Sequence, residues 1–143
     1  MCIRDSLGRQ GPQVPTELAA RARLAQLLAP ERPGEAAAHV DRCDEILAAG
    51  EDWRGALAPV ELGRAAVAAA RGDAAAADTA SERALRVTVN HRLPWREAAA
   101  LDAWGRLADD RGDRQVAAER WRRAREVYRR LGAPDRWLES AAR

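Results

Sequence analysis

The strongest constraint on the fold of this chain is a tripeptide that occurs twice. It stands at Arg71-Gly72-Asp73 and again at Arg111-Gly112-Asp113, and each copy separates two stretches with helical periodicity. Glycine can adopt the left-handed conformation that closes a helix, and aspartate can cap the next helix by accepting backbone N–H bonds. The same tripeptide is known in cell adhesion, but its position at two equivalent turns explains it structurally. The sequence therefore predicts two helical hairpins.

Apolar residues on both sides of the second turn recur at intervals of three and four, as one face of an α-helix requires. The first helix of this hairpin is predicted from Glu97 to Ala108, and the second from Asp113 to Leu131. After the earlier turn, a helix is predicted from Asp73 to about Val89. The apolar positions of the later hairpin are Leu101, Trp104, Ala108, Ala117, Trp121, Ala124, Tyr128 and Leu131.

The two hairpins are related by a constant offset along the chain. The offset between the two turns also relates Ala77 and Ala84 to the alanines at positions 117 and 124, whereas Leu62-Gly63 stands slightly further from its match, Trp104-Gly105. This difference predicts a longer first helix and a shorter exit loop in the earlier hairpin. Paired helices that repeat with a period of about 40 residues are typical of an α-solenoid.

This pattern resembles the tetratricopeptide repeat (TPR). That family places a large and then a small residue on the first helix, glycine at the turn, and a small, an aromatic and a small residue on the second helix. The resemblance implies an all-α fold: a right-handed α-solenoid of about three hairpins with a short C-terminal capping helix. We expect a close helix crossing in which Gly105 faces Ala117 or Trp121. The matching positions are Leu62, Gly63, Gly72, Ala77, Ala84, Trp104, Gly105, Gly112, Ala117, Trp121, Ala124 and Tyr128, with Ser81 replacing the earlier aromatic.

The chain is expected to divide into a lead-in segment and one repeat domain. The lead-in covers residues 1–15 and the TPR-like helical repeat domain covers residues 16–143. Residues 1–6 resemble the translated end of a sequencing adapter, which implies that the protein extends upstream; an ordinary disordered start is the alternative. Such a segment is excluded from fold reasoning. The expected hairpins lie at about 16–50, 53–90 and 95–132, and the capping helix at 135–142.

Three further helices are predicted before Gly72. The first is capped by Thr16 and runs from Glu17 to Ala29, the second runs from Glu35 to Ala49, and the third begins at Glu51-Asp52. No strand is expected. The residues expected to be buried are Leu24, Leu27 and Leu28 on the first helix, Val40, Cys43, Ile46 and Leu47 on the second, and Leu57, Val60, Val67 and Ala70 on the third.

The composition indicates the source and the cellular location of the protein. All 24 basic residues are arginine, which suggests a GC-rich bacterial genome, and the net charge is only +2. No run approaches the roughly 18 apolar residues of a membrane span. Cys2 lies in the adapter-like segment, so Cys43 stands alone and no disulfide framework is expected. We therefore expect a cytoplasmic protein without membrane contact.

The sequence offers little catalytic chemistry. There is no glycine-rich phosphate loop with a lysine, and His39 and His91 have no partner at metal-ligand spacing. The pair Asp109-Asp110 could serve acid–base or divalent-metal chemistry, but a solvated helix end is favoured. We predict no catalytic, cofactor-binding or metal-ligating residue. Three evenly spaced tryptophans, at positions 53, 95 and 137, are expected to be buried between hairpins, with an aromatic ligand cage as the alternative.

One helix is strongly basic. From Asp113 to Arg130 there are seven arginines and three acidic residues. Arg122, Arg125 and Arg129 are candidate contacts for an acidic protein partner or, less favoured, for nucleic acid. The alternative is a solvated face in which Glu119 pairs with Arg123 and Glu126 pairs with Arg130.

Residues 40–140 also resemble the C-terminal TPR tail of large bacterial AAA/STAND ATPase regulators, such as nucleotide cyclase–ATPase fusions or LuxR-type ATP-binding regulators. The resemblance implies a non-catalytic protein–protein interaction or scaffold module, which would bind a protein partner or another domain of its parent chain. A free-standing TPR adaptor is the alternative, followed by a helical domain that binds small molecules or nucleic acid. The runs that carry the likeness are 46–55, 93–98, 104–106 and 127–133.

Overall fold

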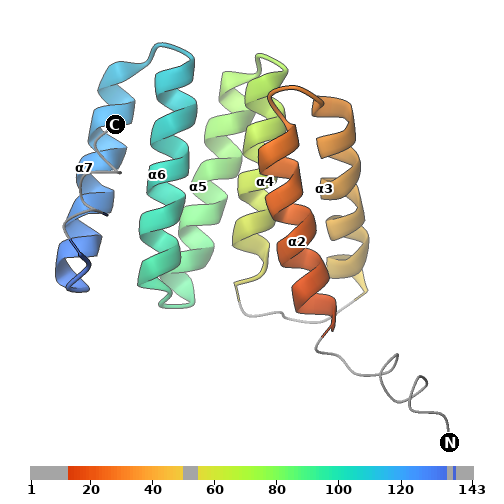
Figure 1. The fold of residues 1–143 in the computed structure, drawn as a ribbon, viewed down its shortest axis with the longest axis horizontal. Helices are drawn as coiled ribbons and strands as arrows, with labels where there is room; N and C mark the ends of the chain where they lie inside the picture. The colour runs from red at the N-terminus through yellow and green to blue at the C-terminus, as the bar shows by residue number, and fades with distance from the viewer. Residues whose placement is uncertain (1–12, 50–54, 135–136, 138–143) are drawn as a thin grey trace, which may run out of the picture.

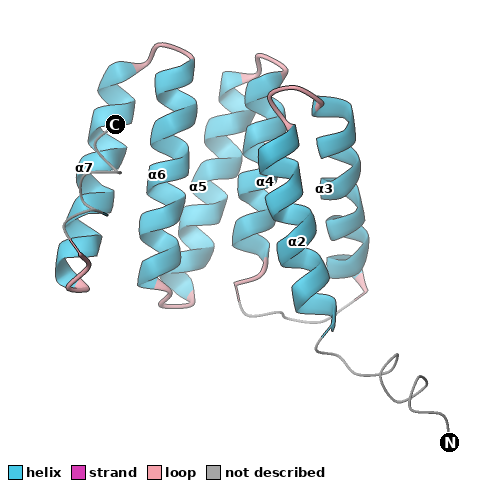
Figure 2. Ribbon diagram, in the orientation of Figure 1, coloured by secondary structure: helices cyan, strands magenta, loops and turns pink. Residues whose placement is uncertain are grey.

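The computed structural model describes residues 13–49, 55–134 and 137. This part of the chain forms six α-helices and contains no strand (Figure 2), which confirms the all-α fold class. The helices are α2 (Gln13–Leu28), α3 (Pro33–Ala48), α4 (Leu57–Ala70), α5 (Ala74–Asn90), α6 (Pro94–Asp110) and α7 (Arg114–Arg130).

Successive helices run antiparallel, and their connections alternate between the two ends of the molecule (Figure 1). As a result, α2, α4 and α6 all run in one direction, and α3, α5 and α7 run in the other. The central helix α4 contacts α2, α3, α5 and α6, whereas α7 contacts only α6 among the described helices. The first helices of successive pairs therefore lie next to one another.

Both hairpin turns form as the sequence predicts. Gly72 and Gly112 adopt positive φ angles of 78° and 88°, a region that is open to glycine without steric cost. The carboxylate of Asp73 accepts a bond from the backbone N–H three residues on at 2.9 Å, and Asp113 does the same at 3.2 Å. Each turn thus stops one helix and starts the next.

Two clusters of buried side chains hold the helices together. One joins α2, α3 and α4, and the other joins α5, α6 and α7. Removal of such apolar surface from water is the main stabilising contribution to the fold. The first cluster contains Leu18, Ala22, Ala25, Ala29, Ala36, Val40, Cys43, Val60 and Val67, and the second contains Leu85, Ala98, Leu101, Trp104, Ala124, Val127 and Tyr128.

The predicted apolar stripe of the first helix is wrong for two of its three leucines, whereas Leu28 is partly buried against the first cluster. The helix begins at Gln13, so Thr16 lies within it, and Leu24 and Leu27 are 41% and 60% exposed. The buried face is built mainly from small residues, because alanines allow α3 and α4 to approach α2 closely. That face consists of Leu18, Ala22, Ala25 and Ala29.

The expected lengths of the two first helices are also wrong. The earlier one, α4, has 14 residues and α6 has 17, so the earlier helix is the shorter. Leu57 is 39% exposed and Ala70 is exposed, whereas Val60 and Val67 are buried as predicted. The predicted helix start at Glu51-Asp52 and the capping helix at 135–142, except for Trp137, lie outside the described residues.

Candidate functional site

A groove of about 700 Å³ lies along α2, α4 and α6. These three helices run in parallel, and the groove extends over the part of α4 between its neighbours. Its size falls within the range of about 300–1,000 Å³ that is usual for ligand pockets. Most of its lining is apolar and small, including Ala66, Ala69, Ala70, Ala99 and Ala103.

Alanines create this groove because they leave space that longer side chains would fill. One larger apolar residue from each helix borders it: Leu27 on α2, Leu62 on α4 and Leu107 on α6. Leu27 belongs to the predicted stripe of the first helix, and its 60% exposure is explained by its position at the groove. The groove itself was missed from the sequence, which gives no signal for it because its three leucines lie on different helices.

The α6 side of the groove carries charge. Asp102 forms an ion pair with Arg106 at 2.8 Å, and its side chain is only 17% exposed. The second carboxylate oxygen of Asp102 is buried without a hydrogen-bond partner in the described part of the chain. Burial raises the pKa of the neighbouring Tyr128, and the Asp102 charge raises it further. A ligand would therefore meet an apolar lining bordered by polar groups.

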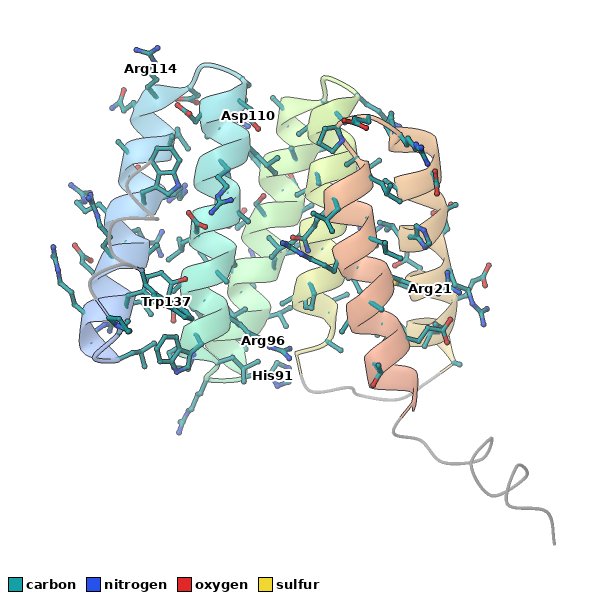
Figure 3. The ribbon with its side chains drawn as sticks, viewed as in Figure 1. Arg21, His91, Arg96, Asp110, Arg114 and Trp137 are labelled. Carbon is teal, nitrogen blue, oxygen red and sulfur yellow. The ribbon has the colours of Figure 1, made fainter. Side chains whose placement is uncertain are left out.

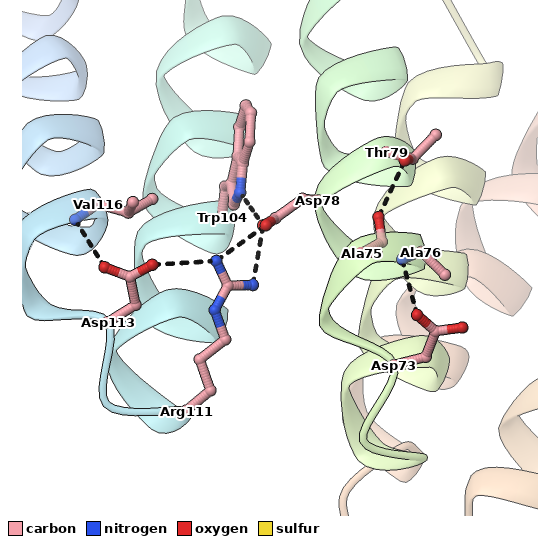
Figure 4. A network of polar contacts seen from close by, with 9 residues as sticks. All are labelled: Asp73, Ala75, Ala76, Asp78, Thr79, Trp104, Arg111, Asp113 and Val116. Carbon is pink, nitrogen blue, oxygen red and sulfur yellow. Dashed lines mark hydrogen bonds and ion pairs between the residues drawn. The ribbon is translucent and has the colours of Figure 1, made fainter.

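A polar network ties α5 to α6 and α7 (Figure 4). The carboxylate of Asp78 accepts a bond from Trp104 Nε1 at 2.7 Å and two from the Arg111 guanidinium at 2.8 and 2.9 Å. Arg111 also lies 3.6 Å from the carboxylate of Asp113. Arg111 and Asp113 thus have structural roles at the turn, and Asp78 was not singled out by sequence.

We expect this network to make stability depend on acid pH. Burial acts to raise the pKa of Asp78, but the hydrogen bonds from Arg111 and Trp104 outweigh it, so the pKa is lowered. A depressed carboxyl pKa stabilises the fold above about pH 4, where an unfolded aspartate ionises, and this contribution is lost as pH falls through the folded pKa. Urea midpoints measured from neutral to acid pH should therefore fall less steeply for Asp78→Asn.

The matched control for this series is Asp110→Asn, which changes an exposed carboxylate that makes no ion pair in the described structure. The urea midpoint of this variant should fall toward acid pH as steeply as that of the parent protein. An equally steep fall of the urea midpoint in Asp78→Asn would contradict the assigned role of the Asp78 carboxylate.

The residues of the repeat pattern lie mainly inside the molecule. A Cβ atom on Gly105 would lie 2.5 Å from Trp121 Nε1, which confirms that Trp121 crosses close to this glycine. Ala77, Ala84, Trp104, Ala117, Ala124 and Tyr128 are buried, Leu62 and Trp121 are half-buried, Gly63 is buried, and Gly72 and Gly112 form the turns.

The match of Gly63 to Gly105 needs correction. A Cβ atom on Gly63 would lie 3.1 Å from the Cβ of Ala25 on α2, so this glycine faces the preceding helix and not its hairpin partner. The reason is that α4 ends at Ala70 and α6 ends at Asp110, so the two helices follow the register of the turns. In that register the counterpart of Gly105 is Ala65, which is fully buried.

The two described tryptophans of the evenly spaced series are not buried. Trp95 and Trp137 are 46% and 41% exposed. They pack with Tyr128, with ring centroids 5.5 to 6.1 Å apart, which is the usual range for aromatic pairs. Rings in mutual contact leave no space for a ligand between them, so this cluster is not a cage. Trp53 lies outside the described residues.

The basic stripe lies on α7 as expected, but the predicted ion pairs do not form. Glu119 pairs with Arg120 at 3.2 Å instead of with Arg123. No ion pair joins Glu126 and Arg130 in the described chain. Arg122 and Arg129 are exposed and Arg125 is half-buried. Arg120 is occupied elsewhere, since its guanidinium lies 3.9 Å above the ring of Trp104.

The remaining candidates have structural surroundings. The Sγ of Cys43 lies 3.9 Å from the carbonyl oxygen of Leu18, and burial raises the pKa of this thiol. His39 Nδ1 lies 3.3 Å from a guanidinium nitrogen of Arg21. His91 and the pair Asp109-Asp110 are exposed at helix ends. Among residues 13–49, 55–134 and 137, no group of His, Cys, Asp and Glu side chains could hold a metal ion.

No helix in the described ranges is long and apolar enough to cross a membrane. Comparisons of this chain with protein-family models, with curated proteins and with solved structures found no match. The groove and the faces that the helices leave exposed are therefore the features that bear on function.

Proposed function

We propose that this chain is a non-catalytic protein-interaction module whose groove along α2, α4 and α6 holds a segment of another protein. The observation that carries the proposal is the groove itself: about 700 Å³, lined by alanines and bordered by leucines. Amphipathic helices commonly bind in such grooves by inserting apolar side chains at helical spacing. The alanine lining offers depth for those side chains, and Arg23 and Arg106 can pair with acidic residues at the margins.

The proposal extends to the class of fold. Two observations support a right-handed α-solenoid of the TPR type. The turns and helix ends of the two hairpins share one register, and their parallel first helices adjoin one another. A solenoid exposes a continuous surface of equivalent helices to its ligand, and the groove lies on such a surface.

We further propose that the module belongs to the C-terminal part of a cytoplasmic bacterial regulator, where its partner is another protein or another domain of the same parent chain. The likeness of residues 40–140 to the tails of ATPase regulators supports this assignment. The genomic reading frame upstream of Leu7 tests it. An ATPase domain there supports the regulator, whereas a nearby natural start codon and promoter support a free-standing adaptor.

Selection from a displayed library of helical peptides on the immobilised protein tests the interaction function directly. We expect enriched peptides with apolar side chains at helical spacing. Ala99→Trp should weaken their binding, measured by calorimetry, about tenfold or more, since it fills the groove and each tenfold corresponds to about 1.4 kcal/mol. Ala99 is exposed, so the larger side chain should not disturb the core.

Ala38→Trp is the matched control, because Ala38 is an exposed alanine of α3 that does not line the groove. This variant should bind the selected peptides like the parent protein. Failure to enrich any peptide, or equal binding by Ala99→Trp, would count against the groove. Magnesium-dependent nucleotide hydrolysis that follows the protein through purification would overturn the non-catalytic assignment.

A further inference from the structure

Four arginines of α7 lie on one side of the helix and form a ridge that Ala118 interrupts between Arg114 and Arg122. With 3.6 residues per turn, Arg114, Arg122, Arg125 and Arg129 fall within about 80° of the helix circumference. The two glutamates of α7, at positions 119 and 126, lie outside this sector. Three of the four arginines are exposed and Arg125 is half-buried. The ridge therefore carries four positive charges and no acidic residue.

The ridge is not neutralised within the molecule. In the described residues none of its four side chains forms an ion pair or a hydrogen bond. Elsewhere Arg86 pairs with Glu82 and Arg42 pairs with Glu45 on their own helices, although Arg83 of α5 is also without an ion pair in the described chain. The positive charge of the ridge is thus left for a partner.

An exposed aromatic edge adjoins one end of the ridge. Tyr128 immediately precedes Arg129 on α7, and its ring packs against the half-exposed rings of Trp95 and Trp137. Figure 3 shows Trp137 near the lower half of α7, while Arg114 extends from the opposite end of that helix. The surface therefore combines apolar rings with a row of cations, and we call it the α7 surface.

We propose that the α7 surface is a second docking site, which adjoins the groove at Tyr128 and binds an acidic amphipathic helix of a partner protein. The spacing supports this occupant: Arg122, Arg125 and Arg129 are three and then four residues apart, and carboxylates at the same spacing on a partner helix would face them. The apolar side of that helix would cover the aromatic edge.

Nucleic acid fits these observations less well. A duplex would pair its phosphates with the arginines, but its bases are stacked inside and leave the rings of Trp95 and Trp137 uncovered. A single strand can stack bases on those rings, so it is a competitor in the test. The chain also has a net charge of only +2, so acidic residues on other faces would repel an extended polyanion. An amphipathic helix satisfies both halves of the α7 surface.

Fluorescence anisotropy with a labelled synthetic helix tests the proposal. The probe carries glutamates at i, i+3 and i+7 with leucines on the adjacent face. We expect saturable binding that weakens with added salt. The triple variant Arg122→Glu, Arg125→Glu, Arg129→Glu should lose at least about tenfold in affinity, because three favourable contacts become repulsive.

The control triple variant Arg71→Glu, Arg83→Glu, Arg92→Glu changes net charge by the same amount on exposed residues of other segments. It should change affinity by less than about twofold. Trp95→Ala, or a probe with serine in place of leucine, should weaken binding severalfold. The groove variant Leu27→Ser, on α2 and 60% exposed, should leave the binding unchanged. Circular dichroism of each variant verifies that the helices remain folded.

Several results would overturn the proposal: no binding of the probe, equal losses in both triple variants, or tighter binding of a short single strand or duplex of DNA at the same salt concentration. If neither Trp95→Ala nor the serine probe changes the affinity, the binding is unspecific charge attraction, and this result also overturns the proposal. If the triple variant does not fold, the double variant of the two exposed residues, Arg122→Glu and Arg129→Glu, replaces it with the same criteria.

Discussion

Replacing Gly105 with leucine should lower the free energy of unfolding by about 3 kcal/mol, because the hairpin has no room for the new side chain. A Cβ atom at this position would lie 2.5 Å from Nε1 and 2.7 Å from Cδ1 of Trp121. The indole is half-buried and its Nε1 donates to the carbonyl oxygen of Asp102 at 3.4 Å. Accommodation of leucine therefore requires that α6 and α7 move apart.

Gly105→Ala should cost less, about 0–2 kcal/mol, because the better helix propensity of alanine offsets about 1 kcal/mol of an overpacking loss that is typically about 1–3 kcal/mol. Chemical denaturation of both variants measures the two effects. The dependence of free energy on denaturant is compared between variants to show that the unfolded state is unchanged.

Two further variants control this prediction. Gly34→Ala lies in the first turn of α3, where a Cβ atom would meet nothing within 4 Å, so its stability should stay equal or rise by less than about 1 kcal/mol. In a Trp121→Ala background the cost of Gly105→Ala should shrink, since the two positions are in contact. Raised midpoints for both Gly105 variants would show that the inner face of the hairpin is misassigned.

Truncation of Trp104 to alanine is the other large expected loss, about 3–5 kcal/mol. Trp104 is 7% exposed and lies in the cluster that joins α5, α6 and α7. Its ring also lies 3.9 Å below the guanidinium of Arg120, and its Nε1 bonds to Asp78 at 2.7 Å. Alanine would remove all three interactions and leave a cavity.

Trp104→Phe separates these contributions, because it keeps most of the apolar contact and removes the N–H donor. We expect a loss of about 1–3 kcal/mol, which should diminish in an Asp78→Ala background. Trp95→Ala is the control, since Trp95 is 46% exposed and its truncation should cost clearly less than that of Trp104. Equal losses in the free energy of unfolding for Trp104→Ala and Trp95→Ala would contradict the placement of Trp104 in the core.

Some features of this protein follow from short stretches of sequence. The turn at Gly72-Asp73 and the turn at Gly112-Asp113 were predictable because a left-handed glycine and a capping aspartate act on backbone groups close to them in the chain. The resemblance to the TPR also predicted a close crossing at Gly105, with Ala117 or Trp121 as the facing residue, and the structure places Trp121 there. The basic face of α7 is likewise a property of one helix.

The buried face of α2, in contrast, does not follow from a short stretch of sequence. Its sequence holds two overlapping stripes, one of leucines and one of alanines, and local periodicity does not choose between them. The choice depends on how closely α4 approaches, and Gly63 comes so near that its Cβ would lie 3.1 Å from that of Ala25. Close approach favours the alanine stripe and leaves Leu24 and Leu27 exposed.

The groove and the Asp78 network depend on tertiary structure for the same reason. Leu27, Leu62 and Leu107 come from three different helices, and Asp78 meets Arg111 across 33 residues. By itself the sequence determined the turns, the helices and the contacts within one hairpin, because these depend on neighbours along the chain. Only the packing of separate helices decided which faces are covered, since the burial of a side chain depends on distant segments that approach it.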